Sequence, residues 1–346
     1  MLYFATLLDI NYLSRTQAMY ESIKRHHNNF VLYIVCLDGE VYDYFKKNGQ
    51  DNIVLITLKE IEEKYKELET IKSTRNAIDY IFTLSPFYPS YILQKFTHIP
   101  FICSLDCDQY FFNNVEFLFK ALEKYSVLIL PHRFTKDLKH LEVFGKYNVS
   151  FQVFKNDDMG NRCLALWRSQ CLEWCSDVLE EDRFADQKYL DKWQEHFGNS
   201  VQAINYIGIG LAPWNLRDKK IKIRNKKVYV DDKMLVVYHY QGLRIVYKNL
   251  INSGLAKYNV TPSSSFVTNI LAPIVNAIIQ FRDKPVVDNI NRNAHAKQKN
   301  LIAHISGLGM FYKQGKGLIN LDRLYQLKLK KGKAYGLLNR LTNFYR

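Results

Sequence analysis

Short runs of consecutive apolar residues alternate with amphipathic stretches over the first hundred residues. The runs are bounded by polar or turn-forming residues, which predicts strands buried on both faces. The expected strands are residues 2–8, 30–37, 53–58 and 100–105. The expected helices are residues 41–47, 59–70 and 74–84, and one that follows a capping box at Ser14–Gln17. This alternation predicts an α/β fold with a mostly parallel sheet covered by helices on both faces.

The second half of the chain has a more mixed pattern. The expected elements are strands at residues 126–130 and 149–154, a helix from Asn156 or Asp157 to about residue 180, and a hairpin of residues 228–230 and 234–238 that turns at Asp231 and Asp232. The strand-rich pattern ends near residue 250. We therefore expect a main domain at residues 1–250 and a helical, basic C-terminal extension at residues 251–346.

Positive charge is concentrated in this extension. The chain has 48 Lys and Arg against 34 Asp and Glu, a net charge of +14. Residues 281–346 hold 14 Lys and Arg and 3 Asp, which is +11 and leaves +3 for the first 280 residues. A nearly neutral main domain argues against a uniformly basic nucleic-acid-binding protein. With 47% hydrophobic residues, the 346-residue chain is also not one that is disordered over most of its length.

The six cysteines form no C-x-x-C pair. Cys163, Cys171 and Cys175 recur at helical spacing with Trp167, which predicts buried thiols on one amphipathic helix. This usage favours a reduced, cytosolic protein. The first residues show neither a basic segment nor a cleavage site of a signal peptide, which also favours a cytoplasmic location.

Carboxylates follow the ends of several predicted strands. Asp106-Cys107-Asp108 comes directly after the strand at 100–105, and Asp9 and Asp38 follow two earlier strands. Ligands of parallel sheets bind at the carboxyl ends of the strands, so these side chains are expected to converge. Two carboxylates one residue apart can bind one hard divalent cation, which stabilises charge on a departing diphosphate. By itself, the D-x-D pattern is explained equally well as a polar turn.

Further polar positions suit such a site. His239 ends an apolar strand, and an imidazole beside two carboxylates suits Mn²⁺ better than Ca²⁺. Gly242 lets the backbone approach a phosphate closely. Asp186 and Gln187 can hold sugar hydroxyls, although Asp186 is equally explained as an N-cap and Asn148 as a turn residue. The sequence contains no P-loop, G-x-G-x-x-G, G-x-S-x-G or structural zinc pattern.

Together these residues resemble the GT-A nucleotide-sugar glycosyltransferases, in particular the glycogenin and lipopolysaccharide galactosyltransferase family. The segments that carry the resemblance are Phe4–Tyr12, Asp106-Cys107-Asp108, Tyr147–Ser150, Asp186-Gln187 and His239-x-x-Gly242. They follow one another in the family's order, over residues 2 to about 246. The stretches 145–154, 171–190 and 211–216 also resemble transferases found with bacterial surface-polysaccharide genes.

The resemblance implies a function for each of these positions. Asp106, Asp108 and His239 would bind Mn²⁺ or Mg²⁺. Asn148, Asp186 and Gln187 would face the donor sugar. The nucleoside and its phosphates would contact Thr6, Asp9, Asn11, Tyr12, Asp38, Gly242 and Arg244. The implied enzyme moves a sugar from a nucleotide-diphosphate donor, UDP in the first instance, to a glycan or lipid-linked acceptor in bacterial surface polysaccharide or lipopolysaccharide synthesis.

The resemblance also implies that the anomeric configuration of the sugar is retained. In that case the leaving diphosphate oxygen can accept the acceptor's proton, and Gln187 would stabilise the sugar cation or act as a weak nucleophile. An inverting reaction would need a base, for which Asp186 is the first candidate. The chain departs from the family at two phosphate contacts. The family's lysine after the glycine falls near Ile245, one position from Arg244, and its helix arginine has only Arg75 as a candidate.

Two other functions fit parts of the sequence. A sugar-phosphate nucleotidyltransferase shares the sheet and a metal at its rim, but usually has a glycine-rich loop after the first strand, where this chain has Leu8–Tyr12 without glycine. A non-catalytic nucleic-acid-binding protein would use the basic tail, and salt-sensitive RNA binding without nucleotide-sugar binding would favour it.

The C-terminal extension contains two amphipathic segments. Apolar residues recur at helical spacing over residues 266–281, which predicts a helix. Over residues 324–346, basic residues alternate with aliphatic and aromatic ones, which suits an anionic membrane surface. A helical subdomain that packs on the main domain, with its charges solvated, explains residues 266–281 equally well.

Deletion of residues 320–346 tests the membrane hypothesis. Each Lys or Arg near an anionic surface contributes on the order of 1 kcal/mol, so loss of the cluster should abolish low-salt sedimentation of the protein with anionic liposomes. High salt should release the full-length protein. Liposome binding that the deletion leaves unchanged, or no binding by the full-length protein, would exclude the hypothesis.

Overall fold

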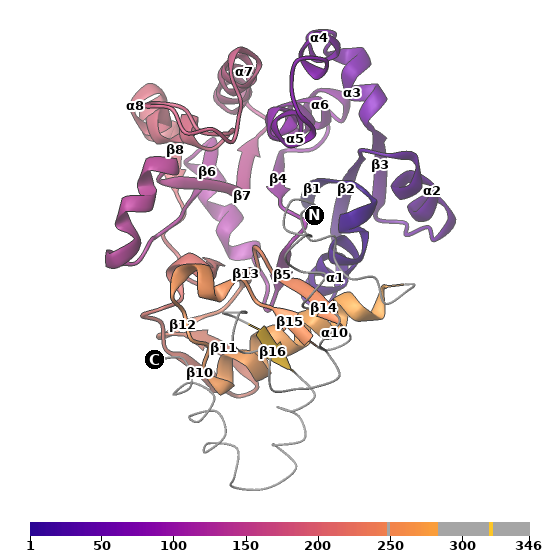
Figure 1. The fold of residues 1–346 in the computed structure, drawn as a ribbon. Coiled ribbons are helices and arrows are strands. Elements are labelled where there is room, and N and C mark those ends of the chain that lie inside the picture. The colour runs from indigo at the N-terminus through magenta and orange to yellow at the C-terminus, as the bar shows by residue number, and fades with distance from the viewer. Residues whose placement is uncertain (248–249, 283–317, 321–346) are drawn as a thin grey trace, which may run out of the picture.

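A computed structural model describes residues 1–247, 250–282 and 318–320 (Figure 1). Its centre is a seven-stranded sheet with the strand order β3-β2-β1-β4-β7-β6-β8. The strands are β1 (Leu2–Leu8), β2 (Phe30–Cys36), β3 (Ile53–Thr57), β4 (Phe101–Leu105), β6 (Val127–Pro131), β7 (Tyr147–Lys155) and β8 (Val201–Ala203). Only β7 runs antiparallel to its neighbours, so the sheet is mostly parallel, as predicted.

Helices cover both faces of this sheet because its strands are apolar on both faces. In β2, Leu32 and Ile34 pack on one face, and Tyr33 and Val35 pack on the other. The first face is covered by α1 (Leu13–Lys24), α2 (Gly39–Lys47) and the 3₁₀ segment η2 (Glu116–Glu123). The second is covered by α3 (Leu58–Lys64), α4 (Glu67–Lys72), α5 (Ala77–Leu84), α6 (Phe87–Lys95), α7 (Asp158–Glu173) and α8 (Trp193–Phe197), at the top of Figure 1.

Smaller sheets and the C-terminal helices form a second layer below the first face. The sheet that matters for the site is β5 (Gln109–Phe111), β13 (Val237–His239) and β9 (Ile209–Leu211). The other two are β10 (Ile221–Arg224), β11 (Lys227–Val230) and β12 (Lys233–Met234), and β14 (Arg244–Tyr247), β15 (Leu250–Asn252) and β16 (Leu318–Asn320). The remaining 3₁₀ segments are η1 (Ile10–Tyr12), η3 (Lys136–Phe144), η4 (Lys188–Lys192), η5 (Gly198–Ser200), η6 (Pro213–Asn215) and η7 (Leu255–Tyr258).

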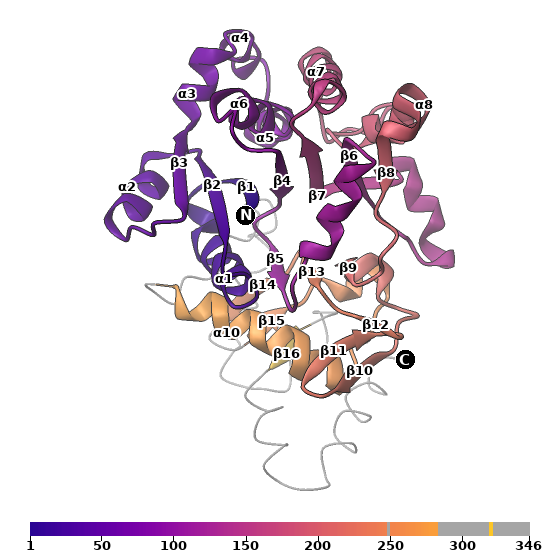
Figure 2. The ribbon, with the colours of Figure 1, turned by 180° about the vertical axis from the view of Figure 1, so that it is seen from behind.

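The predicted helix at residues 266–281 is confirmed as α9 (Ser264–Phe266), a π-helical turn (Val267–Leu271) and α10 (Ala272–Gln280). Its apolar side chains share one core with Ala18 of α1, with Tyr110 of β5 and with Tyr238 of β13. Seen from behind in Figure 2, α10 runs beside α1. This helix therefore packs on the main domain. The basic residues 324–346 lie outside the described residues, and within the described ranges no helix is both long and apolar enough to cross a membrane.

Several predicted boundaries are wrong. The capping box at Ser14–Gln17 is not formed, because α1 already begins at Leu13. The helix predicted to reach residue 180 ends at Glu173, where Trp174 turns to an extended backbone, so Cys175 is buried outside the helix. The hairpin at Asp231 and Asp232 is present, but its second strand is only β12, and the chain then crosses to β13 in another sheet. All six cysteines are buried free thiols.

Candidate active site

The Asp106–Asp108 turn joins the central sheet to the smaller one. β4 ends at Leu105, and β5 begins at Gln109 and pairs with β13, where His239 lies opposite Gln109. The backbone N–H of Tyr240 donates to the carbonyl of Asp108 at 3.0 Å. Strand pairing therefore brings a histidine from late in the chain beside the two carboxylates.

These three side chains form a compact cluster of metal-ligand type. Their ligand atoms all lie within 4.8 Å of one another. His239 Nε2 is 2.9 Å from Asp108 Oδ1 and 3.8 Å from Asp106 Oδ2. The His239 side chain is 5% exposed and that of Asp106 42%, so the cluster is anchored in the protein and open on the Asp106 side. Two hard oxygen ligands and one imidazole fit a divalent cation of the Mn²⁺ or Mg²⁺ type.

The three groups of the cluster shift one another's pKa values in different directions. Burial alone would lower the pKa of His239, but Asp108 and Asp106 outweigh it and raise that pKa above its ordinary value. Burial would raise the pKa of Asp108, but His239 and Arg15 lower it below its ordinary value. For Asp106, burial together with repulsion from Asp108 raises the pKa to about 6 despite the opposing effect of His239. A cation in this position would replace the proton that the site otherwise holds.

Residues of β1 fix the Asp106–Asp108 turn through hydrogen bonds. Thr6 has no exposed surface, and its hydroxyl donates to the Leu105 carbonyl at 2.8 Å. The Cys107 thiol lies 3.1 Å from the Thr6 hydroxyl and donates to the Leu7 carbonyl at 3.1 Å. Cys107 therefore points inward and turns its two neighbours outward. Thr6 thus fixes the position of the turn through Leu105 and Cys107.

Asn148 also acts on the turn through the backbone. Its side-chain oxygen accepts from the backbone N–H of Ser150 at 3.2 Å and from its hydroxyl at 2.6 Å. Its amide donates to the Leu130 carbonyl at 3.3 Å. The Ser150 carbonyl in turn accepts the backbone N–H of Asp106 at 3.0 Å. This side chain is 4% exposed, and its contact with a donor sugar stays a prediction.

The predicted nucleoside residues lie on two neighbouring loops. Asp38 joins these loops, because its carboxylate accepts the backbone N–H of Ile10 and that of Val41, each at 2.8 Å. Asp9 accepts the backbone N–H of Asn11 at 3.1 Å and its side-chain amide at 3.0 Å. Tyr12 is 45% exposed, and burial of its hydroxyl and the nearby Asp108 raise its pKa to about 12. Tyr12 thus lies close to the metal-ligand cluster.

Two further residues lie at this site, although the sequence does not mark them as candidate ligands. Arg15 is 8% exposed, its guanidinium lies 5.2 Å from the Tyr12 ring centroid, and it bonds the Asn11 and Leu243 carbonyls. Trp214 packs edge-on against His239 with ring centroids 5.3 Å apart. Only the folded chain shows their proximity, because neither residue is near the D-x-D turn in sequence.

Gly242 has φ +76°, and Gly254 of the following loop packs against it. A Cβ on Gly254 would lie 2.8 Å from the Gln241 carbonyl oxygen, so this approach of two loops requires glycine. Arg244 lies exposed on β14. Arg75 is directed elsewhere, since its guanidinium bonds the carbonyls of Cys171 and Leu172 at the end of α7.

Asp186 and Gln187 occupy contrasting environments. Asp186 is 2% exposed, its Oδ2 has no hydrogen-bond partner, and burial raises its pKa to about 7. The Ala185 before it has φ +48°, a strained conformation for alanine that is common at functional sites. Gln187 is half-buried and donates to the Phe144 carbonyl at 2.8 Å. Asp106 contributes to the raised pKa of Asp186, which places this carboxyl within electrostatic reach of the metal-ligand cluster.

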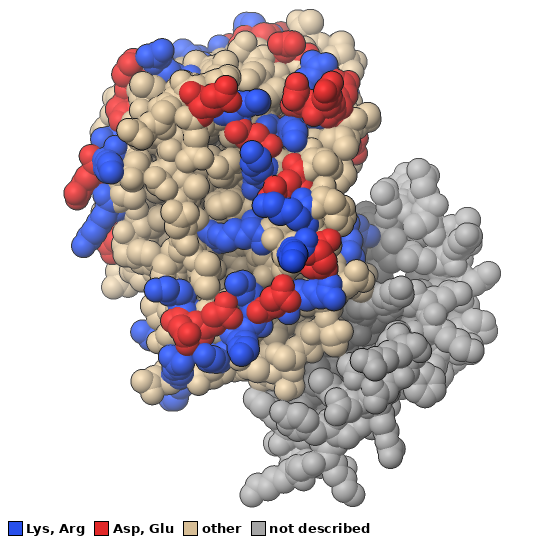
Figure 3. Space-filling view, turned by 90° about the vertical axis from the view of Figure 1, so that its left-hand side faces the viewer, with Lys and Arg blue, Asp and Glu red and all other residues tan. Residues whose placement is uncertain are grey.

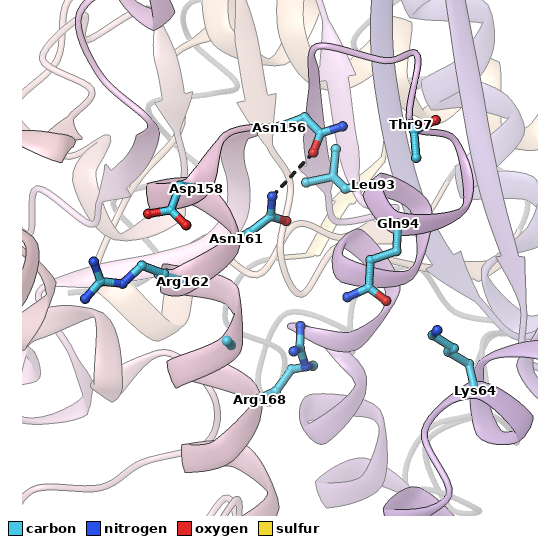
Figure 4. Close-up of a pocket in the computed structure, with 10 residues that line it drawn as sticks. Lys64, Leu93, Gln94, Thr97, Asn156, Asp158, Asn161, Arg162 and Arg168 are labelled. Carbon is cyan, nitrogen blue, oxygen red and sulfur yellow. Dashed lines mark hydrogen bonds between the residues drawn. The ribbon is translucent and has the colours of Figure 1, made fainter.

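A groove of about 840 Å³ lies elsewhere, between α6 and α7 with Lys64 of α3 at its edge (Figure 4). It contains Asn156, whose backbone N–H bonds the Pro100 carbonyl at the beginning of β4. The metal-ligand cluster follows the other end of β4, and a five-residue strand spans roughly 16 Å. This groove is therefore separate from the site at Asp106.

Comparisons with known proteins agree with this architecture. No protein-family model matches the chain. It is similar to two uncharacterized proteins of Bacillus subtilis (strain 168), YfnD at 26% identity over 72% of this chain and 80% of YfnD, and YfnF at 27% identity over 72% of this chain and 84% of YfnF. Among solved structures, the galactosyltransferase LgtC in complex with donor and acceptor sugar analogs matches with a TM-score of 0.51 and 11% identity, over 86% of this chain and all of that one. The chain thus has the GT-A fold of glycosyltransferases.

Removal of single ligands tests the metal site. Asp108→Ala should abolish detectable Mn²⁺ binding, and His239→Ala should weaken it by roughly ten- to hundredfold, because one ligand and its orienting contacts are lost. Isothermal titration calorimetry measures both. Asp232→Ala, at an exposed turn, is the control and should bind like the wild type. Equal Mn²⁺ affinity in all four proteins would exclude a metal at this cluster.

The raised pKa of Asp186 predicts a pH-dependent stability. The folded protein holds this proton up to about pH 7, whereas the unfolded chain releases it near pH 4, so stability falls as the pH rises between these values. Asp186→Asn should therefore gain on the order of 2–4 kcal/mol relative to wild type between pH 4.5 and pH 8. Urea unfolding in EDTA at both pH values measures this difference. A difference that does not change with pH would contradict the burial of an unpaired carboxyl.

Proposed function

We propose that this protein is a metal-dependent glycosyltransferase that uses a nucleotide-diphosphate sugar, UDP-linked in the first instance. The observation that carries the proposal is the Asp106–Asp108–His239 cluster at the carboxyl end of β4. In mostly parallel sheets this edge is where ligands bind. LgtC, which shares the fold, was crystallised with donor and acceptor sugar analogs, and this supports the same class of substrates here.

The residues of the site have distinct tasks in this reaction. A bound Mn²⁺ or Mg²⁺ would stabilise the charge that develops on the leaving diphosphate. Asp106 and Asp108 would hold this ion, and the packed His239 would complete and orient the ligand set. Tyr12 lies near the cluster and Asn11 precedes it; both are exposed and would contact the nucleoside, with Asp9 and Asp38 holding their loop.

The sugar would lie between the metal and Gln187. The Gln187 amide is a neutral dipole beside a buried carboxyl, which suits stabilisation of positive charge on the sugar in the transition state. We propose retention of the anomeric configuration, with the proton of the acceptor hydroxyl passing to the leaving diphosphate oxygen. Nuclear magnetic resonance of the product reports this configuration directly. An inverted product would assign Asp186 the part of a general base.

The acceptor in this proposal is a glycan or a lipid-linked oligosaccharide of bacterial surface polysaccharide synthesis. The basic C-terminal extension would hold the enzyme at an anionic membrane, close to a lipid-linked acceptor.

The surface charge does not favour nucleic-acid binding by the main domain. On the face drawn in Figure 3, positive and negative side chains interleave. The described chain contains ion pairs such as Lys219–Asp231 and Lys222–Asp232, which neutralise basic residues locally. A nucleic-acid-binding face would instead carry an uncompensated basic stripe.

A thermal-shift screen of nucleotide sugars tests the proposed function. The cognate donor should raise the melting temperature in the presence of Mn²⁺ and have little effect in EDTA, because a ligand that binds only the folded state stabilises it. Ligand at about 100 times its dissociation constant stabilises by about 2.7 kcal/mol. No Mn²⁺-dependent shift with any UDP-, GDP-, ADP- or TDP-sugar would contradict the proposal.

A further inference from the structure

The proposed donor site needs more positive charge than its metal supplies. Asp106 and Asp108 together cancel the charge of one divalent cation, so the negative charges of a donor diphosphate require a further cation nearby. On the loop after Gly242 the next residue is Leu243, and Arg244 lies exposed on β14.

Arg15 is a cation close to the metal-ligand cluster. It lies in the first turns of α1, just after the loop of Asp9 to Tyr12, and only 8% of its surface is exposed. A buried guanidinium is costly unless other groups compensate its charge, so its burial beside an acidic cluster is a specific feature of this fold. Its electrostatic effect reaches Asp108, Tyr12 and Tyr240.

Arg15 also joins the two loops that would enclose the diphosphate. Nη1 donates to the Asn11 carbonyl at 3.4 Å and Nη2 donates to the Leu243 carbonyl at 3.2 Å. The first loop carries Tyr12 and the second carries Gly242. A planar guanidinium makes both contacts at once, and its charge lowers the pKa of Asp108 in the metal-ligand cluster.

The second loop is held from its other side too. Gly254 packs on Gly242, and the Tyr258 hydroxyl donates to Gln241 Oε1 at 3.2 Å. With one side fixed by the segment after β15, the contact with Arg15 sets the spacing between the Gly242 loop and the Tyr12 loop. A change at Arg15 therefore acts on this spacing and on the local charge.

We propose that Arg15 is the positioning residue for the donor diphosphate: it links the loop of Asn11 and Tyr12 to the loop of Gly242 and Leu243 and supplies a fixed positive charge beside the metal-ligand cluster. This inference rests on the proposed function. It specifies that the site selects a nucleoside diphosphate over the corresponding monophosphate through Arg15.

The test compares the affinities of UDP and UMP, each with Mn²⁺, by isothermal titration calorimetry. Arg15→Gln keeps a hydrogen-bond donor but removes the charge, and the preference for UDP over UMP should fall about tenfold or more. Arg15→Lys keeps the charge but cannot make both carbonyl contacts with one planar group, so the preference should fall, but by less than in Arg15→Gln. Arg168→Gln is the matched control, because Arg168 also lies over a tyrosine ring, at 5.3 Å from the Tyr65 centroid, but lines the separate groove on α7.

A UDP preference that Arg15→Gln leaves unchanged would overturn the inference, as would equal weakening of UDP and UMP, which a purely structural role predicts. Both results leave the proposed function standing, because the wild type still binds UDP. If the wild type binds none of UDP, GDP, ADP or TDP with Mn²⁺, the proposed function and this inference fail together. If Arg15→Gln does not fold, Arg15→Lys decides alone: a preference for UDP that is lower than in the wild type supports the inference, and an unchanged one overturns it.

Discussion

The pairing of β13 with β5 is the interaction on which the site depends. It brings His239 opposite Gln109, although 130 residues separate them, and places an imidazole 2.9 Å from Asp108. A separation of this size is costly in chain entropy, so the contact must be stabilised by burial around it. Tyr238 and Tyr240, the neighbours of His239, are almost fully buried, and Tyr238 packs on Phe266 of α9. The C-terminal helices thus support the metal-ligand cluster from a distance.

A second constraint is the set of hydrogen bonds that tie polar side chains near the cluster to the backbone. The sequence predicts Asp38 from its place after a strand, and Thr6 and Asn148 from the family resemblance. Each is bonded to a neighbouring strand or loop. Their hydrogen bonds fix the path of the chain around Asp106 and Asp108. Asp106, Asn11 and Tyr12 are among the groups that remain open to a ligand. A rigid frame with a small open set of ligands is what preorganised catalysis requires.

Much of the fold and of the central cluster can be predicted from sequence. The strands of the central sheet are apolar on both faces, so their positions follow from local composition, and the D-x-D turn follows directly from the end of β4. Prediction from the sequence is weaker where tertiary packing determines the presence or the end of an element. β5 and β9 have three residues each, too few for a periodic pattern, and α7 ends at Glu173 although the apolar spacing continues. Arg15 and Trp214 belong to the site only through contacts between distant segments, which no local pattern encodes.

The most direct test of the account is whether the nitrogen of His239 binds the metal together with the two carboxylates. Pulsed electron paramagnetic resonance of the protein loaded with one equivalent of Mn²⁺ reports nitrogen ligands directly. The account predicts a ¹⁴N coupling from one imidazole in the wild type, which is lost in His239→Ala. A bound Mn²⁺ without any ¹⁴N coupling, or a coupling that persists in His239→Ala, would contradict the assignment of this cluster as the metal site.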